Sequence, residues 1–227
     1  MLQDHPAPSL DPQPVADAAL IAAWLAARSR VRGLPAPQPD HGGLRVDTGS
    51  TDELRRYVFA APNEGLRRLA ETVAEPRVFL KACIPSEALR MQLPDRWAIL
   101  SPRYVMTCFG EMIGERRAWP TDYRVELVQD GPIARARITT HAGEPAARGR
   151  AVEHAGVFIY DQIETEPSHQ RRGLGRLVMT TLETARRDRA SPQVLVATED
   201  GRALYASLGW SVHAPYATAT IPPSNAP

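Results

Sequence analysis

A short stretch in the C-terminal half of the chain concentrates residue types that bind phosphate groups. Two glycines one residue apart, Gly173 and Gly175, open an apolar segment of helical period, and Arg171, Arg172 and Arg176 flank them. Glycine leaves backbone N–H groups open to a bulky anion. The first N–H groups of a helix are unpaired donors at the positive end of its dipole. With the arginine charges added, this turn predicts a diphosphate site.

The spacing excludes the two most familiar phosphate-binding motifs. A dinucleotide-binding fingerprint needs a third glycine, and none follows Gly175 at the required distance. A P-loop needs Gly-Lys-Ser/Thr, which occurs nowhere in the sequence. A glycine pair alone is also compatible with a tight strand-to-helix turn whose arginines are simply solvated. The turn is therefore either an anion site of a third kind or a structural turn.

Two segments resemble motifs of the GNAT N-acetyltransferase superfamily. The segment Gln-Arg-Arg-Gly-Leu-Gly at residues 170–175 is similar to its central motif, Gln/Arg-x-x-Gly-x-Gly/Ala. Downstream, Leu-Tyr-Ala-Ser-Leu-Gly-Trp at residues 204–210 resembles its Leu-Tyr-x-x-Leu-Gly-Phe/Trp segment. Two motifs in order carry more weight than one turn. The resemblance covers residues 123–221, less than half of the chain.

The resemblance implies an acyl-CoA-dependent N-acyltransferase that uses acetyl-CoA as co-substrate and needs no metal. Its pyrophosphate would bind at the turn, where the implied contacts are Gln170, Arg171, Arg172, Gly173, Leu174, Gly175 and Arg176. The strand that ends at Thr165 would splay from the strand at residues 193–197. The pantetheine arm would then lie in the gap and bind backbone groups of Ile163 and Thr165. The implied fold is mixed α/β (α+β), with a central twisted sheet flanked by helices.

Acyl transfer from a thioester to an amine needs an acid for the leaving thiolate and a base for the amine. Tyr205 occupies the position of the superfamily's general acid; the structural alternative is a core tyrosine with a bonded hydroxyl. Asp161 and Glu164, on the strand leading to the turn, are the candidate bases. Three residues apart, they would point to opposite faces of a regular strand, and a bulge would change this.

Composition excludes several other functions. The 227 residues carry a formal net charge of +1, without the basic excess of a nucleic-acid binder. Two cysteines without metal-site spacing argue against a disulfide scaffold or a structural metal, and suit a reducing cytoplasm. The apolar run at residues 18–27 is too short to span a bilayer. We therefore expect a cytoplasmic protein with a small-molecule amine acceptor and no nucleic-acid or membrane partner; a homodimer stays open.

The elements that would position these residues are short and alternate along the chain. The predicted helices span residues 15–32, 64–75, 173–189 and 201–208, with a short one that begins at 86 and ends before Pro94. The predicted strands span residues 44–46, 57–59, 77–83, 97–100, 104–108, 123–128, 133–140, 150–155, 156–165, 193–197 and 210–213. A strand, a helix and a strand in the second half form a crossover, which implies a locally parallel pair.

The chain divides into three predicted parts. Residues 1–43 form a tail, a helix and a linker; residues 44–115 form a degenerate GNAT-like region that covers the acceptor side; residues 116–227 form the acyl-CoA-binding catalytic region. Two features depart from the resemblance. The hairpin signal at Asp130-Gly131 leaves no room for the two helices usual after the first strand, and Thr198 replaces a common asparagine. A non-catalytic acyl-CoA sensor is the alternative function.

Overall fold

The computed structural model describes residues 16–113 and 121–223. Its helices are α1 (Ala18–Val31), α2 (Glu64–Thr72), α3 (Ser86–Arg90), the 3-10 helix η1 (Pro167–His169), α4 (Leu174–Glu183) and α5 (Glu199–Ala206). Its strands are β1 (Gln38–Asp40), β2 (Gly43–Asp47), β3 (Arg55–Phe59), β4 (Val78–Ala82), β5 (Ala98–Ile99), β6 (Arg103–Cys108), β7 (Tyr123–Asp130), β8 (Ile133–Thr140), β9 (Pro145–His154), β10 (Val157–Thr165), β11 (Gln193–Thr198) and β12 (Ser211–Thr220). The mixed α/β fold predicted from the sequence is confirmed.

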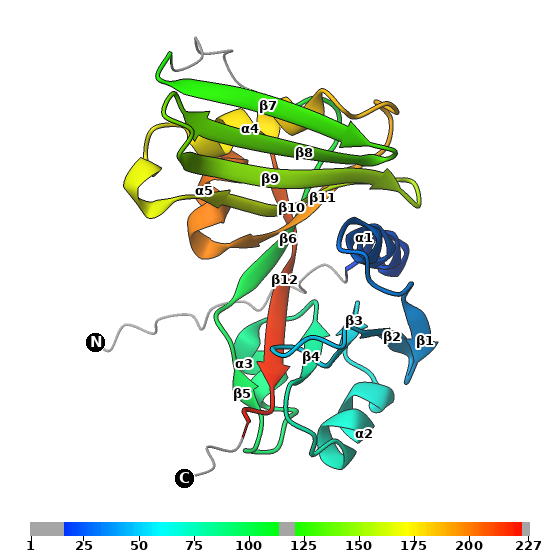
Figure 1. Ribbon diagram of the computed structural model, residues 1–227. Coiled ribbons are helices and arrows are strands. Elements are labelled where there is room, and N and C mark those ends of the chain that lie inside the picture. Colours follow the sequence, from blue (N-terminus) through cyan, green and yellow to red (C-terminus); the bar gives the residue numbers. More distant parts are fainter. Residues whose placement is uncertain (1–15, 114–120, 224–227) are drawn as a thin grey trace, which may run out of the picture.

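All strands join one mixed sheet in the order β1-β2-β3-β4-β12-β6-β11-β10-β9-β8-β7, and β5 pairs with β12. The long strand β12 connects its two halves, as Figure 1 shows. Its first part pairs with β6, and its last part, from Ala217 to Thr220, pairs with β4. In turn β6, which comes before β7 in the chain, lies between β11 and β12. Each half of the sheet is therefore completed by a strand from the other half of the sequence.

The same order of elements occurs in both halves. In the C-terminal half, β10, α4 and β11 form a parallel crossover that α5 follows. In the N-terminal half, β3, α2 and β4 form a second parallel crossover that α3 follows. The division of the chain into three parts stays a prediction, but its second and third parts share one sheet.

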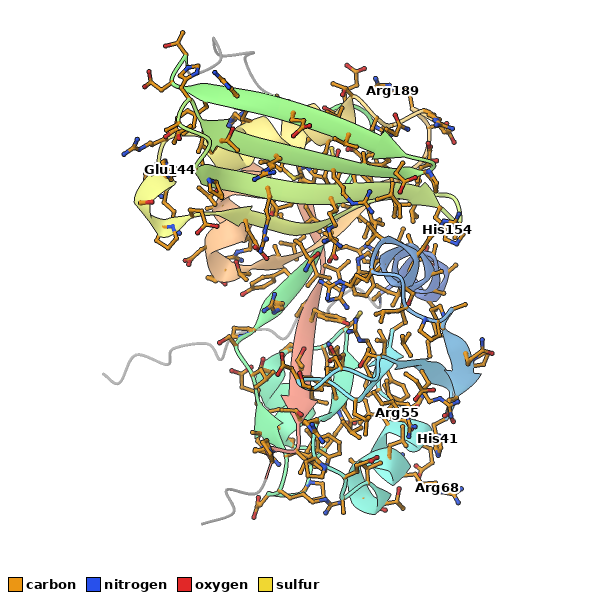
Figure 2. All side chains as sticks on the ribbon, viewed as in Figure 1. His41, Arg55, Arg68, Glu144, His154 and Arg189 are labelled. Atoms are coloured by element: carbon orange, nitrogen blue, oxygen red, sulfur yellow. The ribbon has the colours of Figure 1, made fainter. Side chains whose placement is uncertain are left out.

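Helix α1 covers the sheet face opposite α4. Along β10, Phe158 and Tyr160 pack in the cluster that contains α4, whereas Val157 and Ile159 pack in the cluster that contains α1. Successive residues of a strand point to opposite faces, so α1 and α4 lie on opposite sides of the sheet. Figure 2 shows side chains filling the space between α1 and the strands. Helix α1 belongs to the predicted N-terminal segment, residues 1–43, and the covering role predicted for residues 44–115 on the acceptor side stays a prediction.

Three predicted elements have an end that differs by five or more residues in the structure. The strand predicted over 150–155 begins at Pro145, because it pairs with β8 from Pro145 to Val152. The helix predicted over 173–189 ends at Glu183 because the buried side chain of Arg186 donates to backbone carbonyls, including those of Gly110 and Ser191, which requires the chain to turn. The strand predicted over 210–213 runs to Thr220 because it pairs first with β6 and then with β4. The hairpin at Asp130-Gly131 is confirmed: β7 pairs directly with β8.

We expect a fragment that begins at Pro120 to be insoluble or unfolded. It lacks β6, so β11 and β12 lose the strand that lies between them, and it lacks α1, so one face of β9 and β10 is bare. Solubility, circular dichroism and urea unfolding of the fragment beside the full chain measure this. A soluble fragment that unfolds cooperatively would show that the C-terminal half is independent.

Candidate functional site

The turn before α4 presents a row of unpaired backbone donors. Gly173, the N-cap residue, has a φ of 80°, in the left-handed region, and no side chain within the described part of the chain caps the helix. A Cβ added there would meet nothing within 4 Å, so the space above it is open. No described residue accepts a hydrogen bond from the backbone N–H groups of residues 171–176. These donors lie at the positive end of the helix dipole and suit a phosphate.

Residues on other elements hold the arginine side chains of this turn in place. Arg172 Nη1 donates to Tyr123 Oη at 3.1 Å, and His169 Nδ1 lies 3.0 Å from the same oxygen. Arg176 Nη2 donates to Ser207 Oγ at 2.9 Å. The Arg172 guanidinium is thus tied to β7 and the Arg176 guanidinium to the end of α5. The turn keeps its cationic groups without an acidic partner among the described residues.

The second glycine has a packing role. A Cβ on Gly175 would come within 2.9 Å of Leu204 Cδ2 on α5. Glycine at this position therefore lets the first turn of α4 lie against α5. Gly173 therefore leaves space for the anion, whereas Gly175 leaves space for α5. The spacing of the motif does not reveal this difference.

Strands β10 and β11 separate beside the turn, as predicted. Their parallel pairing covers only Phe158–Gln193 and Ile159–Val194, although β10 continues to Thr165. Glu166 N–H donates to the Ala146 carbonyl on β9, so the backbone groups of Thr165 face the opposite edge, toward the gap. By the same alternation, those of Ile163 face the gap too. The gap therefore offers unpaired backbone groups next to the anion turn, and Gln170 Nε2 lies 3.5 Å from the Thr165 carbonyl oxygen.

A bulge in β10 places the two candidate bases on the same face. The register shifts between Asp161, opposite Arg150, and Glu164, opposite Arg148, and Gln162 has a φ of 54°. Arg148 and Arg150 are two residues apart and share a face, so their partners share it too. The bulge considered from the sequence is confirmed, and the opposite orientation of a regular strand does not occur.

Asp161 is committed to an ion pair. Its carboxylate is buried and accepts from Arg32 Nε at 2.6 Å and Nη2 at 2.9 Å, with Arg28 Nε at 3.5 Å. This pair fastens α1 to β10, which argues against the predicted role as base. Glu164 is half exposed and accepts from Arg148 Nε and Nη2 through one oxygen, Oε2. Its Oε1 has no described partner, so it keeps a free lone pair on the α1 face.

Tyr205 lies on the inner face of α5. Burial raises the pKa of its phenol to about 12, so the hydroxyl keeps its proton at neutral pH. No described residue hydrogen-bonds to that hydroxyl, so the alternative of a bonded core tyrosine lacks its bond. A Cβ on Gly201 would lie 3.1 Å from the ring, so this glycine leaves room for the tyrosine. Thr198 caps α5 by accepting from Gly201 N–H at 3.1 Å, a structural use for the residue that replaces asparagine.

Sequence reasoning missed the arginines that pair with the two carboxylates. Arg148 could have been found, because it lies across the β9–β10 hairpin from Glu164. Arg28 and Arg32 carried no such signal, since more than a hundred residues separate them from Asp161. Tyr123 was also missed as a partner of the arginine-rich turn.

Other kinds of site are not seen in the part of the chain that the structure describes. Within residues 16–113 and 121–223, no three His, Cys, Asp or Glu residues are grouped to hold a metal ion. No helix in these ranges is long and apolar enough to cross a membrane.

Comparison with known proteins gives a match in structure and none in sequence. No family model matches the chain, and no curated protein matches it. A GCN5-related N-acetyltransferase from Kribbella flavida superimposes with a TM-score of 0.63 at 16% identity, over 93% of this chain and 98% of that one. A GNAT-family protein from Novosphingobium aromaticivorans gives 0.53 at 13% identity, over 90% and 97%. An N-acetyltransferase-like protein from Streptococcus suis gives 0.51 at 13% identity, over 74% and 80%. The chain therefore has the fold of the GCN5-related N-acetyltransferases.

Proposed function

We propose that the protein transfers an acetyl group from acetyl-CoA to a primary amine by direct attack. One observation carries the proposal: unpaired backbone donors at the start of α4 lie beside the gap between β10 and β11. A linear cofactor with a pyrophosphate near one end and a thioester at the other matches this arrangement, because the pyrophosphate fits the donors and the arm that carries the thioester fits the gap. The names of the structural neighbours support acyl transfer in general.

In this proposal, the turn binds the pyrophosphate and the gap binds the pantetheine arm. The backbone N–H groups from Arg171 to Gly175 would hold the phosphate oxygens, and Arg172 and Arg176 would add charge. Backbone groups of Ile163 and Thr165 would bind the amides of the arm. The acetyl group then reaches the α1 face, where an amine can approach.

The reaction forms one bond and breaks another. It also removes one proton from the amine and supplies one proton to the leaving sulfur. The amine nitrogen attacks the thioester carbonyl carbon, the C–N bond forms and the C–S bond breaks. Glu164 Oε1 takes the amine proton, directly or through water, and Tyr205 gives its hydroxyl proton to the departing sulfur before water reprotonates it. The raised pKa of Tyr205 keeps the acid loaded at neutral pH but weakens its drive to give up the proton.

The cellular setting that fits this proposal is the cytoplasm. Both cysteines, Cys83 and Cys108, are free and buried. Free thiols suit a reducing compartment.

One observation favours the alternative of an acyl-CoA sensor. Both candidate bases already have arginine partners, Asp161 with Arg28 and Arg32, and Glu164 with Arg148. A sensor would bind acetyl-CoA and release no thiol with any amine. Incubation with acetyl-CoA and a library of primary amines, with a thiol-detecting reagent, separates the two. Amine-dependent thiol release supports the enzyme, and its absence in a protein shown to bind acetyl-CoA supports the sensor.

The two carboxylates are expected to respond differently to neutralisation. Glu164→Gln should lower kcat by roughly ten- to a thousandfold, the effect of losing one general base, and leave stability nearly unchanged because the Arg148 pair is exposed. Asp161→Asn should lower the urea midpoint clearly, because it leaves two partly buried guanidinium groups without their carboxylate. Steady-state kinetics and urea unfolding of both variants test this. A fully active Glu164→Gln enzyme would remove the base from Glu164.

A further inference from the structure

Beneath α1, six charged side chains from both halves of the chain meet. We name this group the junction cluster: Arg28, Arg32, Glu53, Arg56, Lys81 and Asp161. Its members come from α1 and its C-cap residue, from the segment before β3, and from β3, β4 and β10. None of the six side chains is more than 27% exposed. The cluster is therefore a set of largely buried charges.

The cluster has more cations than carboxylates. Arg32 and Arg28 pair with Asp161, while Arg56 Nη2 and Lys81 Nζ lie 2.6 and 2.9 Å from the two oxygens of Glu53. Four cations against two carboxylates leave a formal excess of two. Burial, together with the neighbouring Arg56, lowers the pKa of Lys81 to about 7 and that of Arg28 to about 10. An excess of cations is costly in a buried setting.

Two buried polar groups in the cluster's surroundings have no partner among residues 16–113 and 121–223. Arg56 Nε and Tyr216 Oη are shielded from solvent, and neither makes a hydrogen bond with a described residue. Tyr216, on β12, is 4% exposed, and its ring stands edge-on to Trp24. Burial raises the pKa of its hydroxyl, and the charges of Arg28 and Arg56 oppose this rise. The Arg28 guanidinium is 17% exposed and makes no hydrogen bond with a described residue. Unmade hydrogen bonds of buried groups are costly, so these groups suit a ligand.

Asp161 connects the cluster to the proposed site of acyl transfer. Asp161 is the last residue before the β10 bulge, and Glu164, just beyond the bulge, points to the same sheet face. That face is the α1 face, opposite α4 and its anion turn. An acceptor whose amine lies at Glu164 would therefore extend its other end toward α1.

We propose that the junction cluster binds the carboxylate of the acceptor, so that the acceptor is an amino acid or a similar compound with both an amine and a carboxylate. This inference rests on the proposed acetyl transfer. Arg56 Nε and Tyr216 Oη supply two donors for the two carboxylate oxygens, and Arg28 supplies the accessible charge. A bound carboxylate would offset one positive charge of the excess, and comparison with inorganic phosphate below tests the choice between the two anions.

A kinetic comparison of matched acceptors tests the substrate class. Glycine, β-alanine, 4-aminobutyrate and the common α-amino acids are compared with their amides, which keep the amine and lose the charge. The preferred amino acid should exceed its amide in kcat/KM by at least about tenfold, the loss of one charge-assisted hydrogen-bond pair. Tyr216→Phe should lower that ratio at least about threefold and leave the affinity for acetyl-CoA unchanged. Equal rates for acids and amides in an active enzyme would overturn the inference.

A binding measurement without turnover separates this inference from the acetyl-transfer proposal. Thermal unfolding is followed at constant ionic strength with acetate, the preferred amino acid, inorganic phosphate or chloride. The carboxylates should raise the Tm of the wild type, and Tyr216→Phe and Arg56→Met should remove the rise. Arg67→Met, which deletes an exposed arginine on α2, is the matched control and should keep it. Equal stabilisation by all four probes would mean an adventitious ion only, and no response to the carboxylates would also overturn the site, whether or not the protein transfers acetyl groups.

Discussion

Gly173→Glu should abolish the binding of acetyl-CoA by a folded protein. The substitution puts a side chain and a negative charge into the open space above the α4 N-terminus, where the pyrophosphate would lie. Several charge-assisted hydrogen bonds, each contributing about 1.5–3 kcal/mol, would be lost together, so Kd should rise by more than about a hundredfold. Isothermal titration calorimetry measures the affinity, and circular dichroism checks the fold.

The matched control is Gly156→Glu. Gly156 has a φ of 78° and open space around its Cα, so the strain and the added charge are the same. It lies in the β9–β10 hairpin, beside His154 in Figure 2. The turn before α4 follows the other end of β10, near Glu144 in the same view. This control should bind acetyl-CoA normally. Unchanged affinity in folded Gly173→Glu would refute the turn as the pyrophosphate site. Gly175→Glu, also expected to block binding, is less informative because Leu204 is within 2.9 Å of the new Cβ.

Tyr205→Phe should lower kcat by roughly ten- to a thousandfold, the effect of removing one general acid. The hydroxyl has no described partner, so the phenylalanine ring keeps the packing against Trp210 and loses no internal hydrogen bond. The affinity for acetyl-CoA and the Tm should therefore barely change. Stopped-flow or steady-state thiol release with an accepted amine measures kcat.

The control is Tyr160→Phe, in the same hydrophobic cluster. Its hydroxyl donates to Gln193 Oε1 at 2.6 Å, so its removal should cost about 1 kcal/mol of stability and change kcat little. We therefore expect Tyr205→Phe to lose activity and keep its stability, and Tyr160→Phe to lose stability and keep its activity. A fully active but destabilised Tyr205→Phe would assign this hydroxyl a structural role and leave water as the proton source.

Features fixed by neighbouring residues could be predicted from the sequence. The Gly173 turn, the Asp130-Gly131 hairpin and the crossover from β10 to β11 depend on backbone conformations that a few adjacent residues determine. The separation of β10 from β11 followed from the resemblance rather than from composition or periodicity.

Features that join distant parts of the chain could not be predicted. The exchange of β6 and β12 between the two halves depends on which strand edges are vacant, and a single sequence does not encode this in local patterns. The ion pair of Arg32 with Asp161 spans 129 residues. The end of α4 depends on Arg186 reaching the carbonyl of Gly110, so helical period alone extended the helix too far.

A crystal structure of the protein with acetyl-CoA tests the proposed function most directly. We expect the pyrophosphate within hydrogen-bonding distance of the backbone N–H groups from Arg171 to Gly175, the pantetheine arm between β10 and β11, and the thioester sulfur beside the Tyr205 hydroxyl. A cofactor bound elsewhere on the protein, or a sulfur remote from Tyr205, would contradict the proposed site.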